Sequence, residues 1–236
     1  MIFAVVLAGG VGSRMGNAEK PKQFLTIGGK PVLIHTIERF FVHPGFEKVI
    51  VPCVKEWKAY TSNLVEKYFP GQDRIVVIEG GSTRNETIMN AIDYIDQAGQ
   101  LNEETIIVTH DSVRPFVTSR MIDDNIEAVK KYGACNTVTP ATDTIVESQD
   151  GKVISNIPDR RQMFQGQTPQ SFRAVTLKKA YESLTEEEKE ILTDACKILV
   201  MKQVPVAMVL GEVYNIKITY PYDMRVAESL LKMTLE

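Results

Sequence analysis

The start of the sequence places the strongest limit on how this chain can fold. Residues 2–8 form an unbroken apolar run, and two glycines, Gly9 and Gly10, follow at once. Such a run is typical of a strand that is buried on both faces, as in a parallel sheet. Because the run is too short for a membrane span and no basic residues precede it, we expect a first strand rather than a targeting segment.

Short apolar runs alternate with amphipathic stretches over most of the chain. This pattern predicts an α/β fold with a mostly parallel, Rossmann-like sheet and helices on both faces. The expected strands are residues 2–8, 48–52, 75–78, 105–109, 136–139 and 205–210, and the expected helices include residues 31–42, 56–68, 84–97, 119–132 and 222–235. A chain of 236 residues suits one sizeable α/β domain, so we predict a single domain over residues 1–236.

Residues 142–165 depart from this rhythm. Apolar and polar residues alternate over 144–147 and 152–154, on either side of the pair Asp150-Gly151, which is a β-hairpin signal. A hairpin with no obvious sheet to join is often an arm that packs on another subunit, so we predict a projecting arm and a homodimer. An ordinary extension of the main sheet explains the same residues equally well.

Charge and cysteine usage exclude several classes of partner and site. The net charge of −3 gives no electrostatic reason to expect a nucleic acid or a membrane surface as partner. The three cysteines, Cys53, Cys135 and Cys196, form no CxxC pair, so neither a disulfide framework nor a zinc site is predicted. We expect a cytoplasmic protein that meets anionic ligands with a local cluster of basic residues.

The glycine-rich turn after the first strand is the predicted nucleotide site. Glycines let the backbone approach a ligand and present N–H groups to phosphate oxygens. A dinucleotide fingerprint would need glycine where the chain has Met15, which argues against a nicotinamide oxidoreductase, and the P-loop pattern has no match. Arg14 and Lys22 bracket the turn. They are either solvated loop charges or, as we favour here, cations that neutralise charge in phosphoryl or nucleotidyl transfer.

The same turn resembles a known family. The stretch Leu7-Ala8-Gly9-Gly10-x-Gly12-x-Arg14-Met15-Gly16, followed by Pro21-Lys22-Gln23-Phe24, is similar to the signature of sugar-nucleotide and alditol-phosphate nucleotidyltransferases. Its Pro-Lys-Gln form resembles the branch that contains the methylerythritol-phosphate and ribitol-5-phosphate cytidylyltransferases. The resemblance covers essentially the whole chain. It implies an enzyme that depends on Mg²⁺ or another divalent cation and uses CTP, with Arg14 and Lys22 stabilising the transition state at the α-phosphorus.

Two further segments correspond to nucleotide-binding parts of that family. Gly80–Thr87 is the segment that would close around the base and ribose, although it also reads as a helix entry with Ser82 as N-cap. His110–Pro115 lies at the carboxyl end of a strand, where open α/β sheets bind ligands. The resemblance implies that these residues contact the nucleotide: Leu7, Ala8, Gly9, Gly10, Gly81, Ser82, Thr83, Arg84, Asn85, Glu86, Thr87, Asp111 and Ser112.

Asp111 is also the metal-ligand candidate that the resemblance implies. Arg114 is either functional or the ion-pair partner of Asp111. His110 is more simply a structural histidine than a metal ligand, because the motif offers no second imidazole near it.

The acceptor site is expected from residues nearer the carboxyl end. By resemblance, Arg160 and Lys217 hold the acceptor phosphate, with Arg161 as the alternative to Arg160. Alternation over residues 215–219 predicts a strand with Asn215, Lys217 and Thr219 on one face. Because Arg160 comes from the end of the arm, an active site shared between subunits is a reasonable hypothesis. The segment 193–195 matches a family segment near the acceptor, or it is a helix interior.

The identity of the acceptor is predicted from small departures from a family motif. Methylerythritol-phosphate enzymes typically read His-Asp-Ala-Ala-Arg-Pro, whereas this chain has Ser112 and Val113 in the middle of that motif, and it has Thr87 where they favour serine. Both departures resemble ribitol-5-phosphate cytidylyltransferases, which make CDP-ribitol for teichoic acid and other cell-wall polymers. That reading implies a functional pairing with a ribulose-5-phosphate reductase. Methylerythritol phosphate is the alternative acceptor, and a nucleotide sensor without catalysis is a rival from another class.

Overall fold

The structure is a computed structural model that describes residues 1–10 and 20–233. Residue Arg14, assigned above to catalysis, lies outside the described residues. The main strands are β1 (Ile2–Leu7), β4 (Lys48–Cys53), β5 (Ile75–Glu79), β6 (Ile106–Asp111), β7 (Ala134–Pro140), β8 (Phe164–Arg173) and β9 (Ala207–Leu210). The α-helices are α1 (Val32–Phe41), α2 (Lys58–Tyr68), α3 (Arg84–Gln97), α4 (Ser119–Tyr132), α5 (Ala174–Glu182), α6 (Glu186–Glu190), α7 (Ala195–Met201) and α8 (Pro221–Met233).

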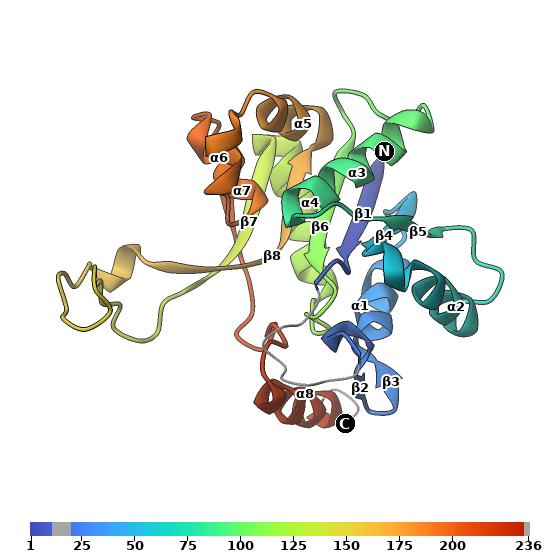
Figure 1. Cartoon of the computed structure of the whole chain (residues 1–236), viewed down its shortest axis with the longest axis horizontal. Helices are drawn as coiled ribbons and strands as arrows, with labels where there is room; N and C mark the ends of the chain where they lie inside the picture. Colours follow the sequence, from blue (N-terminus) through green and yellow to red (C-terminus); the bar gives the residue numbers. More distant parts are fainter. Residues whose placement is uncertain (11–19, 234–236) are drawn as a thin grey trace.

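The strands form one seven-stranded sheet in the order β5-β4-β1-β6-β8-β7-β9 (Figure 1). Strand β1 pairs in parallel with β4 and β6, β4 pairs in parallel with β5, and β7 pairs in parallel with β9. Strand β8 runs antiparallel to both of its neighbours. The predicted mostly parallel sheet is therefore confirmed, but the sequence pattern did not reveal β8.

Helices cover both faces of the sheet, as predicted. One hydrophobic cluster joins α1, α2 and α4 to the sheet, and a second joins α3, α5 and α7 to its other face. In β1, Ala4 and Val6 belong to the first cluster, while Phe3 and Val5 belong to the second. This strand is apolar throughout because each of its faces meets a helical layer.

A smaller cluster supports the carboxyl-terminal segment. It contains Ile27 from the short hairpin β2 (Thr26–Ile27) and β3 (Lys30–Pro31), Val113 from the loop after β6, and Ile218 and Ala227. The cluster brings the segment before α8 against the loop after β6. No helix in the part of the chain that the structure describes is long and apolar enough to cross a bilayer.

The arm leaves the sheet as a continuation of β7 and β8. The last ladder pair is Pro140 with Phe164, and residues 141–163 project away from the body (Figure 1). The two strands predicted at 144–147 and 152–154 are not formed, and a single bridge between Glu147 and Asn156 takes their place. The predicted turn is present, because the Asp150 carboxylate accepts hydrogen bonds from the backbone N–H groups of the two residues that follow Gly151.

Candidate active site

A cavity opens at the carboxyl ends of β1 and β6. These neighbours flank the point where the strand order reverses, since the chain continues from β1 to β4 on one side and returns to β6 on the other. The cavity volume is about 310 Å³, which suits a small ligand. It is lined by Leu7, Gly9, Gly10, Lys22, Gln23, Gly81, Ser82, Thr83, Arg84, Thr87, Asp111, Ser112, Val113 and Lys217.

Most of the candidate residues surround this cavity. Ala8, Asn85 and Glu86 belong to the same segments but lie outside the lining residues, and Arg160 lies on the arm. Two lining residues, Gln23 and Val113, belong to motifs named in the sequence analysis, but no binding or catalytic role was predicted for them. The signal for Gln23 was its place in the Pro-Lys-Gln stretch that follows the glycine-rich turn, because a buried polar side chain there needs a hydrogen-bond partner.

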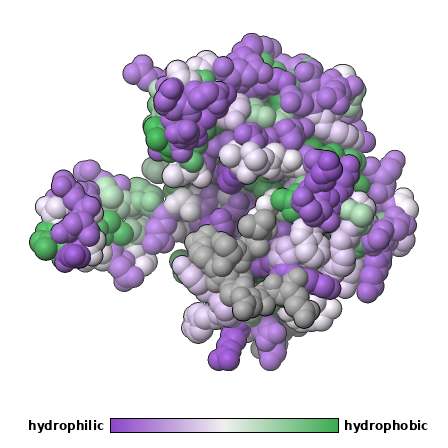
Figure 2. Space-filling view, viewed as in Figure 1, coloured by the Kyte–Doolittle hydropathy of each residue, from purple (hydrophilic) through white to green (hydrophobic). Residues whose placement is uncertain are grey.

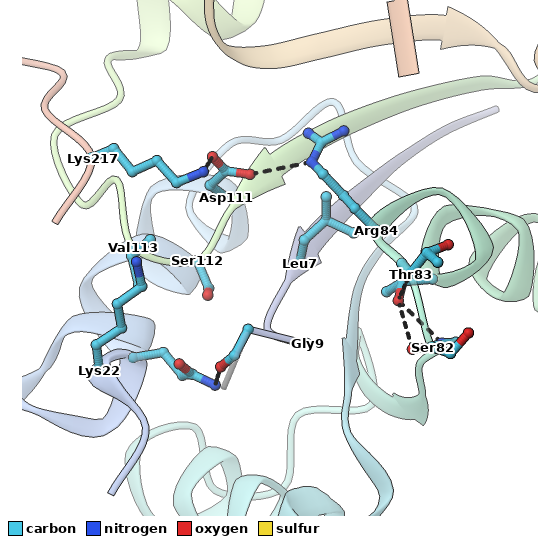
Figure 3. A pocket seen from close by; sticks show the side chains of 14 residues that line it. Leu7, Gly9, Lys22, Ser82, Thr83, Arg84, Asp111, Ser112, Val113 and Lys217 are labelled. Carbon is cyan, nitrogen blue, oxygen red and sulfur yellow. Dashed lines mark hydrogen bonds and ion pairs between the residues drawn. The ribbon is translucent and has the colours of Figure 1, made fainter. Parts of the chain in front are cut away.

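Gln23 shapes the turn that follows β1. Its side-chain amide donates hydrogen bonds to the backbone oxygens of Ala8 and Gly10, both at 3.0 Å, and the residue is buried. Lys22 is also buried, and its side chain extends toward the loop of Ser112 and Val113 in Figure 3. The short 3-10 turn η2 (Lys22–Phe24) therefore carries a cation on the cavity side, while Gln23 bonds to the backbone at the end of β1.

The loop between β5 and α3 forms another wall. Thr83, not Ser82, caps α3: its hydroxyl accepts a hydrogen bond from the backbone N–H of Glu86 at 3.1 Å. The carboxylate of Glu86 accepts hydrogen bonds from the N–H and the hydroxyl of Ser82, which lowers the pKa of Glu86 chiefly through the hydroxyl. Thr87 accepts a hydrogen bond from the N–H of Gly81 at 3.1 Å. The side chains of Glu86 and Thr87 thus hold the loop in place.

Gly81 allows this loop to turn tightly. A Cβ placed on Gly81 would lie 2.4 Å from Cβ of Glu86, closer than two such atoms can approach. The glycine is therefore required by packing, and its backbone remains accessible from the cavity.

Asp111 lies between Lys217 and Arg84 (Figure 3), and Arg114 adds a third cation beside it. Its Oδ2 lies 2.9 Å from Nζ of Lys217 and 3.6 Å from Nε of Arg114, and its Oδ1 lies 3.6 Å from Nε of Arg84. Burial raises the pKa of Asp111, but the charges of Arg84, Lys217 and Arg114 outweigh burial and hold the pKa well below its ordinary range. Asp111 is therefore ionised at neutral pH, and the cluster as a whole is positive.

Within the described part of the chain, a single acidic side chain, that of Asp111, lines the cavity. Among residues 1–10 and 20–233 there is no group of three or more His, Cys, Asp or Glu side chains that could hold a metal. Asp111 is a single carboxylate in a positive cluster, so a bare dication is repelled there. A metal bound mainly through triphosphate oxygens needs only one protein carboxylate, and Asp111 can supply it.

The segment that carries Lys217 is not a strand, contrary to the sequence prediction. Residues 215–219 lie outside the ladders, and Asn215 is fully buried whereas the Lys217 side chain is 40% exposed. Ile216 and Ile218 pack in the smaller hydrophobic cluster. The segment is held by hydrogen bonds to the loop after β6, among them one from the N–H of Ile218 to the oxygen of Val113 at 2.9 Å.

His110 has the structural role expected for it. Its Nε2 lies 2.9 Å from the backbone oxygen of Arg114, and its Nδ1 lies 3.0 Å from the hydroxyl of Thr168. Because a carbonyl can only accept, Nε2 carries the proton and Nδ1 accepts from Thr168. Burial lowers the pKa of His110 to about 4, so the ring is neutral at pH 7.

The two acceptor-site alternatives on the arm make different local contacts. Arg160 donates a hydrogen bond to the backbone oxygen of Thr142 at 2.6 Å, and Arg161 forms an ion pair with Asp159 at 2.7 Å. Arg160 is thus held within the arm rather than in the cavity of its own chain. Asp194, for which a helix interior was an alternative, is instead the N-cap of α7 and accepts a hydrogen bond from Gln170 at 2.9 Å.

Comparisons with known proteins give a consistent family. A family model described as IspD, 2-C-methyl-D-erythritol 4-phosphate cytidylyltransferase, matches residues 2–233. The structure is similar to 4-diphosphocytidyl-2C-methyl-D-erythritol synthase from Anaerococcus prevotii, with a TM-score of 0.80 and 26% identity over 98% of this chain and 96% of that chain.

Two other solved structures agree. The 2-C-methyl-D-erythritol 4-phosphate cytidylyltransferase of Francisella tularensis has a TM-score of 0.80 and 27% identity, over 97% of this chain and 98% of that chain. The protein of the same name from Thermus thermophilus has a TM-score of 0.71 and 26% identity, over 98% of this chain and 100% of that chain.

Proposed function

Because this chain belongs to the IspD family of cytidylyltransferases, we propose that it transfers CMP from CTP to a small polyol phosphate and releases pyrophosphate. The observation that carries the proposal is the convergence of two cations from distant parts of the chain on one cavity. Lys22 comes from the turn after β1, and Lys217 comes from the segment before α8. Gly81, Ser82 and Thr83, the loop suited to the nucleoside, line the same cavity, and Ser82 and Thr83 lie across it from the two lysines in Figure 3.

The mechanism needs positioning and charge neutralisation rather than a general base. The second pKa of a phosphate monoester is ~6, so the acceptor phosphate is mostly dianionic at neutral pH and is already a nucleophile. Lys217 binds this dianion beside the donor. Lys22, together with Arg14, neutralises the charge that develops on the α-phosphate and on the leaving pyrophosphate. Asp111 would be the protein ligand of a divalent cation such as Mg²⁺ that arrives with CTP, and this cation would add to the neutralisation of charge on the phosphate oxygens.

We propose ribitol 5-phosphate as the acceptor, with CDP-ribitol for teichoic acid or a similar cell-wall polymer as the product. The support is that the departures from the methylerythritol-phosphate pattern, Thr87, Ser112 and Val113, all line the cavity. Ser112 places a hydroxyl where that pattern has a methyl group. We assign Ser112 to both substrates, because it adjoins Asp111, whose carboxylate pairs with Lys217. Its hydroxyl then favours ribitol phosphate, which carries one more hydroxyl than methylerythritol phosphate and lacks its methyl group.

Methylerythritol 4-phosphate is the second candidate acceptor. It is favoured by the names of the matching family and of the similar structures. At 26–27% identity, these relatives support the reaction class more strongly than the acceptor.

Pyrophosphate release decides between the two acceptors. The protein is incubated with CTP and Mg²⁺, alone and with each polyol phosphate, and compared with reactions that contain EDTA or another nucleoside triphosphate. We expect release with CTP, Mg²⁺ and ribitol 5-phosphate together. Preference for methylerythritol 4-phosphate would refute the acceptor assignment, and a lack of release with either acceptor would refute the enzyme assignment in favour of a nucleotide sensor.

We further propose that the arm forms a homodimer. Val146, Val153, Ile154 and Ile157 of the arm are about half exposed or more, and apolar side chains are visible at its end in Figure 2. A second copy that covers them would bring Arg160 of each chain to the cavity of its partner. The three free cysteines suit a reducing compartment such as the cytosol, where a ribulose-5-phosphate reductase would supply the acceptor.

A further inference from the structure

We propose that Asn215 is a positioning residue that holds Lys217 at the acceptor end of the cavity. The inference rests on the proposed function, because it concerns how the lysine for the acceptor phosphate is kept in place. Asn215 is fully buried and does not line the cavity. It therefore acts on a ligand only through the residues that it holds.

A lysine in this segment needs anchors that a sheet does not provide. Lysine has a long, flexible side chain that binds phosphate as a point charge, and Lys217 lies outside the strand ladders. Its placement therefore depends on how firmly the backbone at 215–218 is fixed. An error of about 1 Å in the position of a binding group can cost on the order of 10²-fold in rate.

The side chain of Asn215 fastens the segment to strand β8. Its Nδ2 donates hydrogen bonds to the backbone oxygen of Thr168 at 2.9 Å and to the side-chain oxygen of Gln167 at 3.0 Å. Gln167 in turn donates to the backbone oxygen of Glu212 at 2.9 Å. Both hydrogens of the Asn215 amide are used. The segment is thus joined to β8 at two points, Glu212 and Asn215.

The backbone on either side of Lys217 is fastened to the loop after β6. Arg114 donates to the backbone oxygen of Asn215 at 2.7 Å, and the N–H of Ile218 donates to the oxygen of Val113 at 2.9 Å. Lys217 thus lies between two attachments to the loop that follows Asp111.

Thr168 connects these attachments to Asp111. Its backbone oxygen accepts from Asn215, while its hydroxyl accepts from the backbone N–H of Asp111 at 3.1 Å. One residue of β8 therefore serves as reference point for both members of the Lys217–Asp111 pair. Asparagine suits this place because aspartate would set an oxygen against two acceptors, and an apolar side chain would leave those acceptors without a donor.

The experiment measures the binding of the acceptor and the binding of the donor separately. Asn215→Ala and Asn215→Asp are assayed with whichever polyol phosphate the wild type uses, and CTP binding is measured by calorimetry. We expect the KM for the acceptor to rise on the order of 10-fold, the effect of losing one or two buried hydrogen bonds that keep a binding residue in place. The Kd for CTP should change less than about twofold, since Asp111, which shares Thr168 with Asn215, bonds to the hydroxyl of Thr168 rather than to the backbone oxygen that Asn215 holds.

Asn125→Ala is the matched control. Asn125 is also fully buried and donates to Met121 and Thr137, on the α4 side of the sheet. Its loss should lower thermal stability to a similar extent without raising the acceptor KM. If the Asn215 variants do not fold, Gln167→Ala removes one of the two side-chain contacts and should raise the acceptor KM by a smaller factor.

A double mutant tests whether Asn215 acts through Lys217. In a Lys217→Ala background, Asn215→Ala should raise the acceptor KM no further. A further rise, or an acceptor KM unchanged in every Asn215 and Gln167 variant that folds, would overturn the inference. If instead the wild type turns over neither acceptor, the proposed function fails, so the two failures can be told apart.

Discussion

The ammonium group of Lys217 lies 2.9 Å from the carboxylate of Asp111, although the two residues come from opposite halves of the chain. Asp111 is buried, and Arg84 and Arg114 also face it. A phosphate dianion that reaches this end of the cavity meets a cluster with more positive than negative charge. The acceptor can therefore share Lys217 with Asp111 without leaving the carboxylate unpaired, because two guanidinium groups remain beside it.

Replacement of Lys217 by alanine should selectively weaken the binding of the acceptor. Removing the ammonium group takes away the charge that holds the acceptor phosphate, so we expect the acceptor KM to rise on the order of 10²-fold while the Kd for CTP stays close to normal. Steady-state kinetics with both substrates varied, together with calorimetry for CTP, give the two values. Lys202→Ala is a matched control, since Lys202 also pairs with a carboxylate, Glu188, at 3.0 Å but on the far α6 side. A collapse of CTP affinity in Lys217→Ala would contradict the assignment.

Replacement of Lys22 by alanine should act on turnover. A preorganised cation beside the reacting phosphate contributes mainly in the transition state, and loss of one such group typically lowers kcat on the order of 10²-fold or more. Single-turnover formation of the CDP product measures this step. The control is Lys20→Ala, because Lys20 lies over the ring of Tyr60 rather than in the cavity. Near-normal turnover in Lys22→Ala would remove Lys22 from the catalytic group.

The parts of the fold that could be predicted are those with a local signal. Strand β1 and helices such as α3 and α4 have unbroken apolar runs or clear periodicity, and the structure places them within two residues of the prediction. Strand β8 has no such signal. Its residues 164–171 read Phe-Gln-Gly-Gln-Thr-Pro-Gln-Ser, which are mostly polar and include a glycine and a proline. Only its two neighbours in the folded sheet make it a strand, and those are β6 and β7.

The candidate site was predictable where motif residues follow strands. Leu7, Gly81 and Asp111 come directly from or shortly after β1, β5 and β6, and parallel strands bring these ends to one edge of the sheet. The segment of Lys217 was placed on a strand because its residues alternate. In the structure its position depends instead on single hydrogen bonds to residues far away in sequence, such as the one from Asn215 to Thr168. The local sequence pattern does not indicate those partners.

The buried His110 should make stability depend on pH. Its pKa is about 4 in the folded chain and about 6.5 when unfolded. Between pH ~6.5 and pH ~4 the imidazole is protonated in the unfolded chain but stays neutral in the folded chain. The free energy of unfolding should therefore fall by up to about 1.4 kcal/mol for each pH unit over this range. Above pH ~6.5 the imidazole is neutral in both states, and this contribution to the slope vanishes.

Urea unfolding at several pH values, compared with His110→Gln, isolates this effect. A glutamine amide can donate to the oxygen of Arg114 and accept from Thr168 without titrating. The difference in unfolding free energy between wild type and variant should be constant above pH ~6.5 and should shrink below it. Parallel curves from pH 7.5 to 5 would contradict a depressed pKa for His110.

The proposal of an active site shared between two subunits predicts complementation between two defective chains. Arg160 lies on the projecting arm, whereas Lys217 lies at the cavity of its own chain, so Arg160→Ala and Lys217→Ala would damage different halves of each site. In a mixed dimer, one cavity receives an intact Arg160 beside an intact Lys217, and the other receives neither. With random pairing, half of the dimers are mixed, and about a quarter of wild-type activity should return when the two variants are unfolded and refolded together.

One outcome of the mixing experiment would contradict the proposed role of Arg160. Activity no higher than the sum of the separate variants, in a sample shown to contain mixed dimers, would mean that Arg160 does not complete the partner's cavity. The double variant Arg160→Ala/Lys217→Ala, refolded with wild type, is the control. Its mixed dimers contain two half-damaged cavities, because each cavity keeps one of the two residues. If the residues act together across the interface, these mixed dimers should therefore be nearly inactive, and the refolded sample should retain only the activity of its wild-type dimers.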